Sequence, residues 1–183
     1  MITSKKELNS ILKNEKNIYK RLGYKGILHT LITNCEVGLI WKYICYLRKD
    51  EYYLNNLNNK LYFIPYIYNR RKKNRLGIKL GMNIPPNTFD EGLTIYHSGN
   101  IIVNANAKIG KYCKLHGDNC IGNNGIDELA PIIGDNVDIG VGAKVIGNVR
   151  LGSNSVIGAN AVVIKSFNKD NTKLVGIPAK QIN

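Results

Sequence analysis

A six-residue repeat constrains this chain more than any other feature of its sequence. Aliphatic residues occupy every sixth position in two runs that share one phase: Val103, Ile109, Leu115 and Ile121, then Ile133, Ile139, Val145, Leu151, Ile157 and Val163. The residue after each of them is usually Gly, small or polar. An amphipathic helix repeats its apolar residues at three and four positions, and a half-buried strand at two. The repeat therefore indicates neither an ordinary helix nor a simple strand.

Six residues fit one flat face of a triangular coil. Three faces make a coil of about eighteen residues, and successive coils stack at the sheet spacing of about 4.8 Å. Each coil buries its apolar stripe only against its neighbours, so stability comes from stacking. A β-sandwich of short strands would not keep one phase over ten positions. We therefore predict a mainly β protein whose residues 95–168 form a parallel β-helix of about four or more coils.

One segment interrupts the repeat without losing its phase. Position 127, between Ile121 and Ile133, is Asp, and residues 123–130 are mostly polar and contain a glycine. We expect this segment to leave the coil as an extruded loop and to return in register. Loops on a rigid scaffold often carry function.

The first 80 residues show helical spacing instead. Ser4 and Glu7 fit a capping box, which satisfies free amides at a helix start. We predict further helices over residues 36–53 and 57–73, with Pro65 as a kink or boundary. The predicted organisation is an α-helical N-terminal domain over residues 1–76, followed by a β-helical domain with a C-terminal tail over residues 77–183.

The positive charge is concentrated in the helical part. The chain has a net charge of +13; residues 1–80 hold 17 Lys or Arg and 5 Asp or Glu, whereas residues 81–183 hold 9 and 8. Such a field attracts anions, but no recognised nucleic-acid-binding module accompanies it, so nucleic acid is not an expected partner. One basic run follows several tyrosines, and it suits either contact with an anionic membrane surface or the solvated end of a packed helix. Its residues are Arg70, Arg71, Lys72, Lys73 and Arg75.

The cysteines and apolar segments predict a cytoplasmic location. The basic run would add peripheral contact with the membrane. The N-terminus lacks the apolar stretch of a secretory signal, and the longest apolar stretches are too short to span a bilayer. The four cysteines show neither CxxC nor zinc spacing, and we expect free thiols. They are Cys35, Cys45, Cys113 and Cys120.

The repeats, together with the sequence VGIPAK at 175–180, resemble the hexapeptide-repeat acyltransferases. Residues 92–104 resemble the serine acetyltransferase branch, and more closely its relatives from capsule and O-antigen gene clusters. The resemblance covers about residues 77–183. It implies a left-handed β-helix, acetyl-CoA as co-substrate, a homotrimer with CoA in the groove between subunits, and no metal.

His97 matches the general base of that family, which removes the proton from the acceptor hydroxyl. Counting back six residues from Val103 also places His97 at a repeat position that is aliphatic elsewhere. An imidazole titrates near neutrality, as a base that must later release its proton requires. A hydrogen-bonded structural histidine in the first coil is the alternative.

The sequence departs from serine acetyltransferases at three positions. Tyr96 replaces the Asp before the base, and Ala130 stands where a second His precedes proline. Asn83 aligns with the Asp that orients the base, with Asp90 or Glu91 as alternatives. Because the missing groups hold an amino-acid acceptor, we predict a sugar hydroxyl of a surface polysaccharide or its precursor. The alternatives are serine O-acetylation in cysteine biosynthesis and, from another class, a non-catalytic trimeric scaffold.

The remaining predicted site residues rest on coil stacking and on the resemblance. With eighteen-residue coils, His116 would lie one step from His97 and could contact the acceptor. The resemblance places CoA near Ala143, Ala161 and the 176–180 turn, including Gly176 and Pro178, with Lys165 and Lys180 meeting phosphates. A zinc carbonic anhydrase on this fold needs three converging histidines, and the coils hold only His97 and His116.

Overall fold

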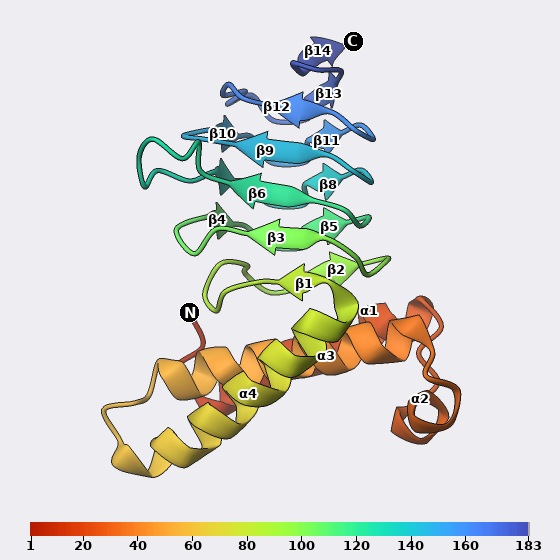
Figure 1. Cartoon of the computed structure of the whole chain (residues 1–183), viewed down its shortest axis with the longest axis vertical. Helices are drawn as coiled ribbons and strands as arrows, with labels where there is room; N and C mark the ends of the chain where they lie inside the picture. The colour runs from red at the N-terminus through yellow and green to blue at the C-terminus, as the bar shows by residue number, and fades with distance from the viewer. Residues whose placement is uncertain (183) are drawn as a thin grey trace.

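Helices form one end of the molecule and a stack of β-coils forms the rest (Figure 1). The computed structural model describes residues 1–182. Its helices are α1 (Lys5–Arg21), α2 (Ile27–Thr33), α3 (Glu36–Leu54), the 3-10 turn η1 (Lys60–Tyr62) and α4 (Phe63–Leu80). The predicted start of the first helix is confirmed, because Ser4 Oγ accepts the Glu7 amide at 3.1 Å.

Two helical details differ from the sequence prediction. The short helix α2 was not expected. Helix α4 continues to Leu80, and Pro65 lies within its first turn, where a missing amide costs no hydrogen bond. Pro65 therefore does not kink the helix, and it lies two residues after the boundary at which α4 begins.

Fourteen short strands follow α4. They are β1 (Met82–Asn83), β2 (Thr94–Ile95), β3 (Ile101–Val103), β4 (Lys108–Ile109), β5 (Lys114–Leu115), β6 (Cys120–Gly122), β7 (Ile132–Ile133), β8 (Asp138–Ile139), β9 (Lys144–Ile146), β10 (Arg150–Leu151), β11 (Val156–Ile157), β12 (Val162–Val163), β13 (Lys173–Val175) and β14 (Lys180–Ile182).

The strands form three parallel sheets, one for each face of the coil. The five-stranded sheet runs β1-β3-β6-β9-β12, the three-stranded sheet runs β4-β7-β10, and the six-stranded sheet runs β2-β5-β8-β11-β13-β14. Among the strands of residues 1–182, β14 alone is antiparallel to its neighbour. Through the middle of the stack each strand pairs with the strand three further along the chain, so the chain winds round the three faces in turn. The predicted left-handed β-helix is confirmed.

The extruded loop also lies where the sequence predicts it. Residues 123–131 connect β6 to β7 and project from the stack (Figure 1). Ile121 pairs with Val145, twenty-four residues later, whereas Val145 and Val163 are eighteen apart. The loop therefore adds six residues to one coil without changing the register.

A single hydrophobic cluster joins the helices to the β-helix. It extends from Tyr19 and Ile44 through Met82 to Leu174. The division into two domains at residue 76 stays a prediction, and the change from helix to strand lies between Leu80 and Met82.

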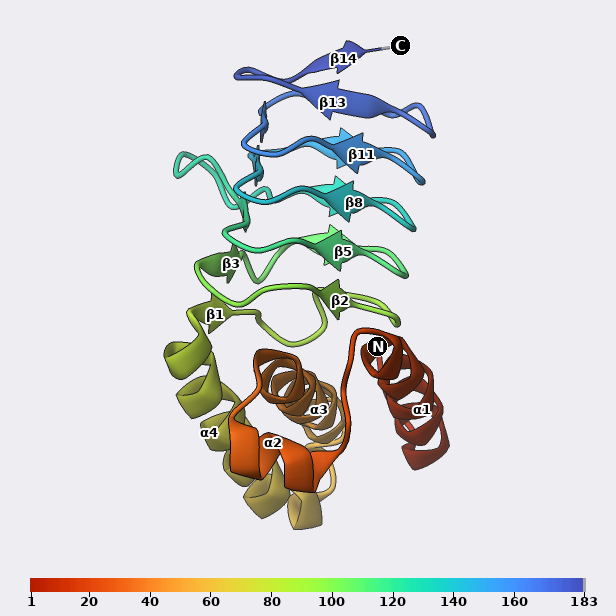
Figure 2. The same ribbon diagram turned by 90° about the vertical axis from the view of Figure 1, so that its right-hand side faces the viewer.

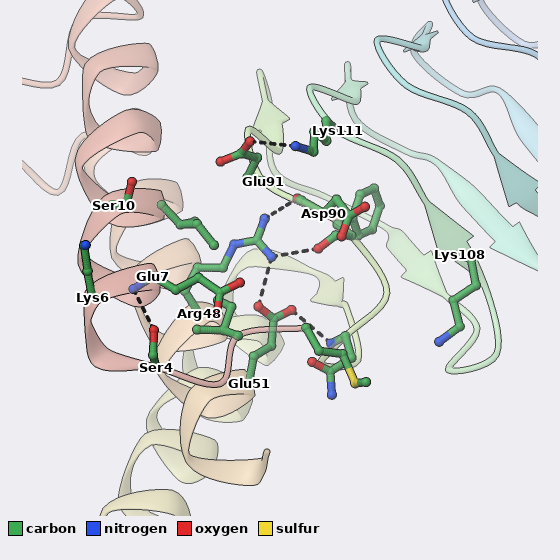
Figure 3. Close-up of a pocket in the computed structure, with 15 residues that line it drawn as sticks. Ser4, Lys6, Glu7, Ser10, Arg48, Glu51, Asp90, Glu91, Lys108 and Lys111 are labelled. Atoms are coloured by element: carbon green, nitrogen blue, oxygen red, sulfur yellow. Dashed lines mark hydrogen bonds and ion pairs between the residues drawn. The ribbon is translucent and has the colours of Figure 1, made fainter. Parts of the chain in front are cut away.

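A buried ion cluster reinforces this junction. Arg48 lies 2.7 Å from Glu15 and 2.9 Å from Glu51, and it also donates to the carbonyls of Phe89 (2.8 Å) and Asp90 (2.6 Å). Figure 3 shows the Arg48 side chain reaching from the helices to the first coil. One guanidinium thus connects α1, α3 and the chain before β2.

The basic run on α4 faces two directions. Lys73 is buried, and its Nζ lies 3.0 Å from Asp50 Oδ2. The prediction that Lys73 contacts a membrane surface is therefore wrong. Arg71, Lys72 and Arg75 are exposed. Within residues 1–182, no helix is long and apolar enough to cross a bilayer.

Candidate active site

His97 lies in the corner between β2 and β3. Leu93 and Ile95 point inward before this corner, and Ile101 and Val103 point inward after it, so the spacing is eight residues instead of six. The two extra residues place His97 in an exposed turn. The prediction that His97 takes an inward aliphatic position is wrong, because the phase shifts at this corner.

A carboxylate from the helical part meets this histidine. Glu36 begins α3, and its Oε2 lies 3.3 Å from His97 Nδ1. Its Oε1 accepts the Ser98 amide at 2.9 Å and the Ser98 hydroxyl at 2.8 Å. The pKa of Glu36 lies below its usual value, chiefly because the Ser98 amide donates to it.

The contact fixes the chemical form of a neutral His97. An ionised carboxylate only accepts hydrogen bonds, so Nδ1 must carry the proton that joins them. The other nitrogen, Nε2, is then the unprotonated one. A neutral His97 thus presents a proton acceptor on the side away from Glu36.

The groups predicted to orient His97 do not do so. Asn83 lies in β1 of the five-stranded sheet, where it pairs in register with Ile102 of β3. It has no hydrogen bond to His97 among the described residues. The carbonyl of Asp90 accepts from Arg48, and Glu91 lies 3.2 Å from Lys111. Glu36 was missed because it lies 61 residues before His97. The sequence signals only an acidic residue at a helix start.

His116 lies beside Tyr96 and not beside His97. The register pairs Ile95 with Leu115, so the first full coil has twenty residues and not eighteen. The Tyr96 and His116 rings are stacked with centroids 4.5 Å apart, and His116 Nε2 lies 2.8 Å from Asp138 Oδ1. The predicted offset was wrong by two residues, because of the corner insertion. His116 still adjoins the site, since a Cβ on Gly117 would lie 3.3 Å from that of His97.

The corner of His97 is the first in a line of stacked corners. The turns from the six-stranded to the five-stranded sheet lie along this edge, at residues 96–100, 116–119, 140–143 and 158–161. The hairpin turn at 176–179, between β13 and β14 of the six-stranded sheet, continues the edge beside β12, where the Val162 amide donates to the Gly176 carbonyl at 3.0 Å. Figure 2 shows the six-stranded sheet from which these turns leave. Gly176 and Pro178 are exposed in the hairpin turn. The edge therefore runs from the predicted base to the predicted CoA-binding turn.

Two predicted CoA residues cannot line a groove with their side chains. Ala143 and Ala161 are fully buried in the β-helix core. Their amides donate to the Gly140 and Gly158 carbonyls within the same corners. The small side chains fit the interior of the coil, so this part of the prediction is corrected. Lys165 and Lys180 are exposed.

A cavity at the junction of the helices and the β-helix lies apart from His97. The cavity has a volume of about 580 Å³ and adjoins the Arg48 cluster (Figure 3); Asp90 and Glu91 line it, but His97, Glu36 and His116 do not. In residues 1–182, no three His, Cys, Asp or Glu side chains gather as a metal site. The candidate site is instead an open corner with His97, Glu36 and the Tyr96–His116 pair.

Sequence comparisons identify the β-helical part. The family described as bacterial transferase hexapeptide (six repeats) matches residues 130–165. Serine acetyltransferase of Synechococcus elongatus is 34% identical over 105 residues, covering 56% of this chain and 43% of that protein. The Mycobacterium tuberculosis enzyme is 32% identical over 108 residues, covering 57% and 47%. The match thus spans less than half the length of these relatives.

Solved structures share the whole arrangement of helices and β-helix. A Neisseria gonorrhoeae serine acetyltransferase has a TM-score of 0.72 at 24% identity, covering 97% of this chain and 66% of that chain. Soybean serine acetyltransferase has a TM-score of 0.74 at 22% identity, covering 96% and 69%. A Brucella abortus serine acetyltransferase with coenzyme A has a TM-score of 0.72 at 22% identity, covering 97% and 68%. At these identities the likeness shows the fold. Residues 130–165 thus carry the bacterial transferase hexapeptide repeat, and the chain is related in sequence to serine acetyltransferases over 105 residues.

Proposed function

We propose that this chain transfers an acetyl group from acetyl-CoA to an acceptor hydroxyl, with His97 as general base. The observation that carries the proposal is the exposed His97, whose Nδ1 is held by Glu36 at 3.3 Å in a β-helix related to serine acetyltransferases. A histidine held in this way has Nε2 ready to accept a proton.

The chemistry follows from that orientation. His97 Nε2 takes the proton of the acceptor hydroxyl while the oxygen attacks the thioester carbonyl. The resulting tetrahedral intermediate collapses, the carbon–sulfur bond breaks, and the departing CoA sulfur receives the proton from His97. Binding both substrates along one edge lowers the entropic cost of their encounter.

We place L-serine first among acceptors. The curated relatives are named serine acetyltransferases, and none of those compared supports the predicted resemblance to polysaccharide enzymes. A sugar hydroxyl remains the second candidate because of Tyr96. Its ring stacks on His116 beside the base, which offers an aromatic surface and a polar rim of the kind that orients small ligands.

The assembly is part of the proposal. We propose a homotrimer in which CoA lies along the edge that ends at the turn with Gly176 and Pro178. An open edge in one chain is consistent with a site that a neighbouring subunit completes. A monomeric mass by light scattering would contradict the trimer, and absence of CoA binding would favour a non-catalytic scaffold.

Replacing the proposed base tests the activity. His97→Ala should lower kcat by about 10²–10⁴, the usual contribution of a general base. CoA affinity and melting temperature should stay close to those of the parent protein, since His97 is exposed. The assay measures thiol release from acetyl-CoA with L-serine and, separately, with a panel of sugars.

His116→Ala is the matched control. It removes the neighbouring imidazole and should cost less in kcat than His97→Ala. Full kcat in His97→Ala would overturn the mechanism. Turnover with sugars but not with serine would reverse the order of acceptors.

A further inference from the structure

We infer that Glu36 is the positioning residue for His97, so that the helical part of the chain completes the catalytic corner. The inference rests on the proposed function. It assigns to the start of α3 the role that the sequence alignment gave to Asn83.

The two carboxylate oxygens of Glu36 have separate partners. Oε1 accepts both the amide and the hydroxyl of Ser98, at 2.9 and 2.8 Å, and Oε2 is left to face His97 Nδ1. Ser98 is the next residue after His97, so the carboxylate is anchored to the backbone of the same turn. This arrangement is more specific than a surface ion pair, whose two side chains move independently.

Helix α3 holds the carboxylate from the other side. Glu36 lies in the first turn of a 19-residue helix, where the helix dipole favours negative charge. Ile40, Tyr43 and Ile44 on the same helix are buried in the shared core. The carboxylate is thus carried by a packed element, which positions a functional group better than a free loop does.

The charge of Glu36 has a role that its hydrogen bond alone does not supply. When His97 takes the acceptor proton it becomes an imidazolium, and an adjacent carboxylate stabilises that ion. Both side chains are exposed, at 71% for His97 and 45% for Glu36, so solvent weakens the effect. We therefore expect a smaller loss than the roughly 10⁴-fold fall that amidation of the buried triad carboxylate causes in chymotrypsin-like proteases.

Glu36→Gln tests the inference in the full-length protein. A glutamine keeps the shape and can still accept from Ser98, but it loses the charge and can donate to Nδ1. We expect kcat to fall about 10- to 100-fold, which is less than the loss on removing a general base, because His97 remains and only its positioning is weakened. The acid limb of the pH–rate profile should move to lower pH, because the imidazolium loses its partner. KM for acetyl-CoA should not change.

Ser98→Ala is the matched control. It removes one hydrogen bond to Glu36 and leaves the charge in place, so it should lower kcat only a few-fold, as expected for loss of one exposed hydrogen bond. Its acid limb should stay at the parent position. A shift equal to that of Glu36→Gln would mean that geometry and not charge is responsible, and would overturn the inferred charge effect.

A double-mutant cycle separates this inference from the proposed function. If Glu36 acts through His97, adding Glu36→Gln to His97→Ala should cause no further loss in kcat. Equal losses in both backgrounds, or an unchanged kcat and pH profile in folded Glu36→Gln, would overturn the inference while the role of His97 stands. Full activity of His97→Ala would instead remove the proposed function.

Discussion

The helical part and the β-helix are of similar length, but they are stabilised in different ways. The β-helix repeats one unit, and its residues 81–183 have a net charge of only +1. The helical part carries +12 and depends on individual long-range pairs, such as Glu15 with Arg48, which are 33 residues apart. Stacked coils contact mainly their neighbours, so a change in one coil stays local. A change in a helical pair affects the whole junction.

The difference also divides the candidate site. The β-helix supplies His97 and the line of corners, and the helical part supplies Glu36. Regular stacking alone would place the base without orienting it. The irregular half therefore contributes to the candidate site and is not only a support for it.

The sharpest way to break this comparison is to disrupt the junction. Arg48→Ala would leave Glu15 and Glu51 buried without their cation, and removing one partner of a buried ion pair costs about 3–5 kcal/mol. Urea denaturation should show that loss. Arg71→Ala, on the exposed face of α4, should change stability by less than about 0.5 kcal/mol. A small effect of Arg48→Ala would show that the helices contribute little to the fold.

A second test concerns the interior of the coils. Ala161→Trp should overpack the β-helix core and destabilise it by about 1–3 kcal/mol or more. Ile126→Trp, in the exposed extruded loop, is the control and should cost less than about 0.5 kcal/mol. If the Ala161→Trp protein is stable but no longer binds CoA, Ala161 lines the cofactor groove and does not fill the core.

The smallest expected effect concerns the turns of the β-helix. Asn136, Asn154 and Asn171 occupy equivalent corners with φ between 55° and 58°, and Asn136 Nδ2 donates to Asn154 Oδ1 at 3.0 Å. Asn154→Ala should cost about 1–2 kcal/mol, because alanine keeps the Cβ that disfavours this backbone conformation but lacks the short polar side chain that lets asparagine adopt it.

Asn154→Gly tests the cause. Glycine adopts positive φ without that penalty, so this variant should be more stable than Asn154→Ala in thermal melting. The reverse order would mean that the asparagine ladder, and not the backbone conformation, stabilises the corner.

Much of the β-helix could be predicted from the sequence. The six-residue period identified the parallel coils and the loop at 123–130, because each repeat contacts its neighbours through the same inward positions. His97 was found through the motif around it. The period failed at the corner after β2, where two added residues separate the inward positions Ile95 and Val103 by eight residues instead of six. This shift displaced the expected neighbour of His97.

The tertiary structure alone decided which side chains meet outside the repeat. Small residues at inward positions, such as Ala161, have the same sequence pattern whether they fill the core or line a groove. Lys73 belongs to a basic run, yet it pairs with buried Asp50. Glu36 reaches His97 only because α3 packs under the first coil. A repeat is specified by local contacts that recur along the chain, whereas these pairings depend on how two distant elements pack, which no local pattern encodes.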